Sequence, residues 1–204
     1  MAFRCGAIRR IGGRWQPGMD PRQDEAEALM AALARGERGA LARLVTLFGP
    51  GLRRYAAQAL TVGSEAEDVT QEVFLRAWHR AGLYDPGRGS VAAWLYRIAV
   101  RICIDRNRRG RFRRFVGIDA IAEPEDEAPG AEATVAARQR LARVRAAIRA
   151  LPARQRQAIL LRAAGGLGTA EIARTLGISA GAAEQLLVRA RAALRATVDR
   201  EDHR

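Results

Sequence analysis

The sequence lacks lysine entirely: all 35 basic residues are Arg, they outnumber 22 acidic residues, and the formal net charge is +13. Histidine occurs twice and cysteine twice, as the isolated Cys5 and Cys103, so no group has the spacing of a metal site. No phosphate-binding loop or nucleophile motif is present either, which argues against an enzyme or a cofactor. Without a membrane-length apolar run or the apolar core of a signal peptide, we expect a cytoplasmic protein with no membrane insertion.

Aromatic residues are also scarce, at 5%, and few stretches are rich in β-branched residues. Hydrophobic residues still make up 49%, mostly as Ala and Leu, which favour helices, so we expect an all-α chain with a packed core. The Arg-only basic set is also what a genome rich in G and C would encode. A positive charge this large nevertheless indicates a polyanionic partner, either nucleic acid or an anionic membrane face.

Capping signals predict where the helices begin. Asp20, Ser64, Ser90, Thr134 and Ser179 each precede a stretch whose apolar residues recur at helical spacing. A further helix opens at Pro152 and ends at the glycine pair 165–166. Within the apolar stretch 40–60, the sequence Gly-Pro-Gly at 49–51 is expected to bend or break the helix.

Composition divides the chain into four parts. Residues 1–19 show no period and are expected to be a disordered extension, so that Met19 could be the true start instead of Met1. Residues 20–109 form a first helical bundle. Residues 110–133 contain three Arg, six acidic residues and several Gly and Pro, as expected of a flexible acidic linker. Residues 134–199 contain twelve Arg against three acidic residues and form a second, strongly basic helical bundle.

The stretch 169–187 has the pattern of a helix-turn-helix. Ala173 is small where two helices cross, and Gly177 follows at the turn, which needs a residue that tolerates positive φ. The second helix of such a motif enters the major groove of DNA, and its predicted outward residues are Ser179, Gly181, Glu184, Gln185, Val188, Arg189, Arg191 and Arg195. Glu184 and Gln185 could read bases, whereas Arg191 and Arg195 suit phosphates. An ordinary helical hairpin with a solvated face would have the same capping and turn residues.

Four segments in this order resemble the extracytoplasmic-function (ECF) sigma factors of bacterial RNA polymerase. They are EAEDVTQEVFLRAW at 65–78, WLYRIA at 94–99 running on to Asp105 and Arg106, LPARQR at 151–156, and the helix-turn-helix. The resemblance covers roughly 20–109 and 134–197. It implies two domains, a region 2 that binds core polymerase and the promoter −10 element, and a region 4 that binds the −35 element.

The resemblance also implies residue roles. In the first domain, Asp68, Gln71 and Glu72 are the expected contacts to the β′ clamp helices of core polymerase. The −10 element would be captured as a melted strand by Tyr84, Asp85, Arg88, Arg97, Arg101, Arg106, Arg108 and Arg109. The second domain would touch the β flap, and the linker would run near the template strand and the RNA exit path.

An anti-sigma factor is an expected further partner beside core polymerase and promoter DNA. The main alternative is a conventional helix-turn-helix transcriptional regulator that does not join the polymerase holoenzyme. It would explain the second bundle but leave the acidic helix at 65–78 without a purpose.

Overall fold

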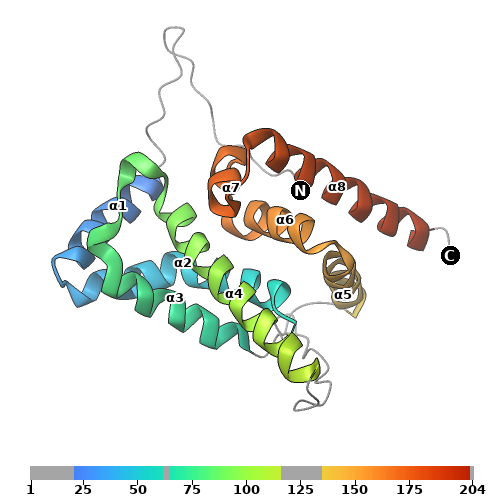
Figure 1. Ribbon diagram of the computed structural model, residues 1–204, viewed down its shortest axis with the longest axis horizontal. Coiled ribbons are helices and arrows are strands. Elements are labelled where there is room, and N and C mark those ends of the chain that lie inside the picture. Colours follow the sequence, from blue (N-terminus) through green and yellow to red (C-terminus); the bar gives the residue numbers. More distant parts are fainter. Residues whose placement is uncertain (1–20, 62–64, 116–134, 203–204) are drawn as a thin grey trace, which may run out of the picture.

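The protein is described here by a computed structural model that covers residues 21–61, 65–115 and 135–202, and within these ranges all the regular elements are helices (Figure 1). The first bundle contains α1 (Pro21–Ala34), α2 (Arg38–Ala59), α3 (Ala66–Arg80) and α4 (Val91–Phe115). The 3-10 turns η2 (Ala81–Leu83) and η3 (Pro86–Arg88) connect α3 to α4. The second bundle contains α5 (Val135–Ala150), α6 (Ala153–Gly165), α7 (Thr169–Leu176) and α8 (Ala180–Asp202). The expected all-α architecture of two bundles is confirmed.

Two of the predicted helix caps are confirmed. Ser90 Oγ accepts a hydrogen bond from the Ala93 amide at 3.1 Å, and Ser179 Oγ accepts one from the Ala182 amide at 3.2 Å. The caps predicted at Asp20, Ser64 and Thr134 lie outside the described residues, as do the extension 1–19 and the acidic run of the linker. Helix α4 continues past position 110, where the linker was expected to begin, because one glycine inside a long helix costs only about 1 kcal/mol.

Of the bend or break predicted at residues 49–51, the break does not occur, since α2 is one helix with Pro50 inside it. Buried side chains lie along the whole of one side of α2, among them Leu44, Leu52 and Tyr55. Fully burying a Leu or similar side chain contributes about 1.5–3 kcal/mol, so several of them outweigh the roughly 3 kcal/mol that an interior proline costs. Tertiary packing therefore keeps α2 helical even though its local sequence disfavours a helix at Pro50.

The two bundles pack against each other and share one hydrophobic core (Figure 1). Helix α6 lies against α2, and α7 lies against α4. At the centre of this contact the Tyr96 hydroxyl of α4 donates a hydrogen bond to the Ala164 carbonyl of α6 at 2.8 Å. A Cβ atom at Gly51 would lie 2.6 Å from the Tyr96 hydroxyl, so glycine is needed there for the close approach. Burial raises the pKa of Tyr96, which keeps its hydroxyl protonated as a donor.

Candidate nucleic-acid and partner interfaces

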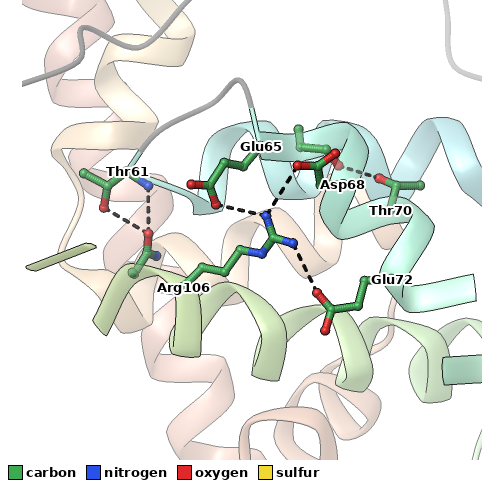
Figure 2. A network of polar contacts seen from close by, with 8 residues as sticks. Thr61, Glu65, Asp68, Thr70, Glu72 and Arg106 are labelled. Carbon is green, nitrogen blue, oxygen red and sulfur yellow. Dashed lines mark hydrogen bonds and ion pairs between the residues drawn. The ribbon is translucent and has the colours of Figure 1, made fainter. Parts of the chain in front are cut away.

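The outer side of α3 carries a row of carboxylates close to its N-terminus. Asp68 and Glu72, two of the predicted polymerase contacts, lie on this side together with Glu65, the residue just before the helix (Figure 2). Gln71, the third predicted contact, is exposed beside them. Positions 65, 68 and 72 are three and four residues apart, which places them above one another on one helical face. The predicted surface is therefore contiguous.

Arg106 of α4 points into this row of carboxylates (Figure 2). Its Nη1 atom lies 3.1 Å from Glu65 Oε2 and 3.9 Å from Asp68 Oδ2, and its Nη2 atom lies 3.2 Å from Glu72 Oε2. Partial burial by itself would lower the pKa of Arg106, but the hydrogen bonds to Glu65 and Glu72 outweigh it and raise the pKa above its ordinary value. The structure thus places this predicted DNA contact on the acidic row.

Leu75 extends the same side of α3 by one turn, and its side chain is 59% exposed. A single exposed leucine is common on protein surfaces, so its weight here comes from its position beside the polar row. Leu75 and Glu65 were not among the residues predicted from the sequence, although their helical spacing to Gln71, Asp68 and Glu72 was a readable signal.

The loop after α3 is built around Tyr84. Its hydroxyl donates to the Gly89 carbonyl at 3.1 Å, and its ring meets that of Trp94 edge to face with centroids 6.0 Å apart. Burial, followed by the nearby Glu27 carboxylate, raises the pKa of Tyr84 to about 12. Tyr84 therefore fixes the shape of the loop, because its hydroxyl bonds the far end of the loop and its ring packs against Trp94.

Asp85 and Arg88, the other predicted loop residues, are exposed. Asp85 Oδ1 accepts a hydrogen bond from the Gly87 amide at 2.9 Å and so caps η3, while Asp85 Oδ2 lies 3.6 Å from Arg88 Nε. The Arg88 side chain is 85% exposed, so this ion pair holds it only weakly. Arg88 is therefore the loop residue most available to a ligand.

The predicted arginines of α4 fall into two groups. Arg101, Arg108 and Arg109 are exposed, and Arg108 lies 3.5 Å from Asp105, one helical turn away. Arg97 is half-buried, and its Nε atom has no hydrogen-bond partner among the described residues. A buried guanidinium N–H without a partner is costly, so an anion beside Arg97 would stabilise it.

The helix-turn-helix has the predicted geometry. Gly177 ends α7 in the left-handed conformation with φ of 65°, and the Ile178 amide donates to the Ala173 carbonyl at 3.0 Å across the turn. Ala183 and Leu187 of α8 are fully buried against the other helices, as expected. This packing fixes the side of α8 that faces outward.

All of the predicted reading residues are on that outward side. The exposed residues are Ser179, Gly181, Glu184, Gln185, Val188, Arg189, Arg191 and Arg195. Glu184 is not free, because its carboxylate accepts a hydrogen bond from Thr169 Oγ1 at 3.1 Å, and Arg162 donates to the same hydroxyl at 2.9 Å. Gln185 is consequently a better candidate for reading a base than Glu184.

The loop 84–90 and the helix-turn-helix lie in contact with each other. Ser90, the cap of α4, donates a hydrogen bond from its hydroxyl to Glu171 of α7. A Cβ atom at Gly89 would lie 3.4 Å from a guanidinium nitrogen of Arg174, also in α7. The first helix of the helix-turn-helix therefore covers one end of the loop.

The described helices include none that is long and apolar enough to cross a membrane. In the same part of the chain no three His, Cys, Asp or Glu residues are grouped so that they could hold a metal ion. Cys103 is buried, and burial raises the pKa of its thiol to about 12.

Comparison with known proteins identifies both bundles. The family described as Sigma-70 region 2 matches residues 44–113, and Sigma-70, region 4 matches residues 141–194. RNA polymerase sigma factor CnrH of Cupriavidus metallidurans is 34% identical over 91% of this chain and 100% of its own length. ECF RNA polymerase sigma factor SigM of Mycobacterium tuberculosis is 33% identical over 87% of either chain.

A solved structure agrees with the sequence relatives. CnrH in complex with the cytosolic domain of CnrY is similar with a TM-score of 0.66 and 31% identity, over 86% of this chain and 98% of that one. Both the sequence and the helical arrangement of this chain thus match the same group of proteins. The chain therefore belongs to the sigma-70 family and is a sigma factor of the ECF group, a non-enzymatic, polymerase-binding protein of transcription initiation.

Proposed function

We propose that the exposed side of α3 binds the β′ clamp helices of core RNA polymerase. The observation that carries this proposal is the row of exposed side chains Asp68, Gln71 and Leu75 on one face of α3, with the half-buried Glu72 at its edge toward α4. Carboxylates give such a surface specificity for a cationic partner, and the apolar residue at the end of the row adds contact area. A conventional regulator outside the holoenzyme would leave this face without a partner.

The loop 84–90 and α4 are proposed to hold the melted non-template strand of the −10 element. Arg88 is exposed on the loop, and Arg101, Arg108 and Arg109 are exposed on the helix behind it. Arginines at this spacing suit successive phosphates of a single strand, while the loop gives an unstacked base a surface to rest on. Tyr84 would contribute indirectly, by keeping the loop in shape. Because Arg106 is held by carboxylates, we leave it out of this DNA surface.

Helix α8 is proposed to read the −35 element in the major groove. Gln185 and Val188 lie in the first half of the helix, where side chains reach base edges, and Arg191 and Arg195 lie further along, where phosphates are in reach. The second bundle would also contact the β flap of polymerase. The proposed path of the linker past the template strand and the RNA exit falls on residues that the structure does not describe.

We further propose that the protein acts in the cytoplasm, where polymerase and promoter DNA are, and that an anti-sigma factor controls it. The similar protein CnrH was solved with the cytosolic domain of CnrY, so a chain of this kind binds another protein in at least one relative. The identity of such a partner for this chain has to come from co-purification.

Charge reversal on α3 tests the polymerase surface. Titration of the full chain with fluorescently labelled core polymerase should show at least about tenfold weaker binding for the Asp68→Lys, Glu72→Lys double variant, since close charge pairs at interfaces carry about 1.5–7 kcal/mol. Glu37→Lys is the control for a single charge reversal outside α3, because Glu37 is exposed in the turn between α1 and α2 and pairs there with Arg35. Binding of duplex −35 DNA should be unchanged in all three proteins. Equal core affinity of the double variant and the parent would place the polymerase surface elsewhere.

A further inference from the structure

Arg106 ties the promoter-facing helix α4 to the proposed polymerase-binding helix α3. Its guanidinium reaches Glu65 and Glu72 at 3.1 and 3.2 Å, and its side chain is only 24% exposed. The next residue, Asn107, accepts a hydrogen bond from the Thr61 amide at 2.8 Å and donates one to the Ala59 carbonyl at 2.8 Å. Asn107 thus anchors α4 to the end of α2, which fixes the place from which Arg106 reaches across.

Arg106 offsets the charge repulsion between the neighbouring carboxylates of α3. Glu65, Asp68 and Glu72 are like charges on one helical face, and like charges at this spacing destabilise a helix and push the side chains apart. Arg106 is within ion-pair distance of all three, and Arg76 also pairs with Glu72. The forked guanidinium can hold two carboxylates in fixed directions, which a single ammonium group does less well.

The same geometry leaves part of the row open. Asp68 lies 3.9 Å from Arg106, too far for a hydrogen bond, and its side chain is 69% exposed. Glu72 is more enclosed, at 31% exposure, with one oxygen on Arg106 and the other on Arg76. Arg106 therefore orders the row from its inner edge while the outer edge stays free for a partner.

We infer that Arg106 is a positioning residue for core polymerase binding, and not a contact to promoter DNA. This inference rests on the proposed function of α3. Side chains that are already ordered lose less freedom when a partner binds, so their order contributes to affinity. By charge alone, the opposite effect is expected: removing Arg106 would make the row more negative and attract a cationic partner more strongly. The two effects differ in sign, and this makes the inference testable.

Core polymerase binding and DNA binding should be measured on the same full-length variants. For Arg106→Gln we expect core affinity to fall at least about fivefold, the lower end of the loss expected when two side chains lose their order. Arg106→Lys keeps the charge without the fork and should bind with intermediate affinity. With saturating core, so that holoenzyme is complete, binding of a fork-junction promoter DNA should match the parent for both variants.

Two further substitutions serve as controls. Arg38→Gln removes one positive charge from an exposed position at the start of α2, and should change neither measurement. Arg101→Gln removes one from the exposed side of α4 and should show the reverse pattern, with weaker fork-junction binding and parental core affinity. In a Glu72→Gln background, Arg106→Gln should reduce core affinity less than it does in the parent. The reason is that the amide side chain then at position 72 has no charge for Arg106 to hold.

Each outcome decides between the two roles of Arg106. Unchanged or tighter core binding by a folded Arg106→Gln variant, with a melting temperature near that of the parent, overturns the positioning role. If Arg106→Gln is unstable, parental core affinity of the Arg106→Lys variant overturns that role instead. If Arg106→Gln has reduced fork-junction binding and parental core affinity, Arg106 contacts promoter DNA instead. If the Asp68→Lys, Glu72→Lys variant binds core normally, the proposed polymerase surface fails first, and the role of Arg106 in it falls with it.

Discussion

Three glycines of α2 allow the contact between the bundles to be tested within a single helix. Glycine in a helix interior is destabilising by roughly 0.5–1 kcal/mol relative to alanine, so an alanine substitution should stabilise the protein wherever the new methyl group has room. At Gly39 a Cβ atom would meet nothing within 4 Å, and at Gly49 it would make ordinary contacts at 3.6 and 3.9 Å. Gly39→Ala should therefore be neutral or stabilising, whereas at Gly49 the following Pro50 disfavours a residue with a Cβ atom in the helical conformation and offsets the gain.

At Gly51 the sign reverses. The added Cβ would lie 2.6 Å from the Tyr96 hydroxyl and 2.8 Å from the Ala164 carbonyl oxygen, so α6 has to move away from α2. Overpacking of this kind costs about 1–3 kcal/mol. Loss of the Tyr96–Ala164 hydrogen bond adds about 0.5–1.5 kcal/mol, against a propensity gain of roughly 0.5–1 kcal/mol. We expect Gly51→Ala to be destabilised by about 1–3 kcal/mol relative to the parent.

Urea unfolding and amide hydrogen exchange on the full chain measure this. Protection of the Gly166 and Leu167 amides, which donate to Arg162 and Leu161 at the end of α6, should fall in Gly51→Ala and stay parental in the other two variants. Tyr96→Phe should show the same pattern with a smaller loss. If Gly51→Ala is as stable as Gly39→Ala and its exchange is unchanged, the two bundles do not meet in solution as the structure describes.

Three other outcomes are expected. Arg191→Ala and Arg195→Ala should weaken binding to all duplexes alike and reduce the slope of log affinity against log salt by about 1 each, as measured by anisotropy titrations on a −35 duplex and on unrelated DNA; a loss confined to one sequence contradicts phosphate contact. Gly177→Ala should lower the free energy of unfolding by about 1–2 kcal/mol, because alanine is strained at positive φ, and a parental urea midpoint would refute this. Tyr84 and Cys103 are neutral when protonated, and burial raises the pKa of each to about 12. Their contribution to stability should be constant below about pH 8.5, where the unfolded thiol ionises, and should be lost as pH rises toward 12, with a shallower fall in stability for Tyr84→Phe.

Local sequence determined much of this protein. Caps at Ser90 and Ser179, the left-handed glycine at 177 and the buried face of α8 follow from rules that act within a few residues, and the structure has all of them. The outward side of α8 was predictable for the same reason, because helical periodicity alone decides which residues share a face. The family motifs, each a short continuous stretch of sequence, were readable for the same reason.

The tertiary structure decided what depends on residues far apart in the chain. Pro50 breaks no helix, because buried side chains from several elements hold α2 together around it. Arg106 looked like one more basic residue of a DNA-facing helix, and only the packing of α4 against α3 places it among Glu65, Asp68 and Glu72. Periodicity assigns a residue to a face of its own helix, but the charge that it meets there is set by the neighbouring helix.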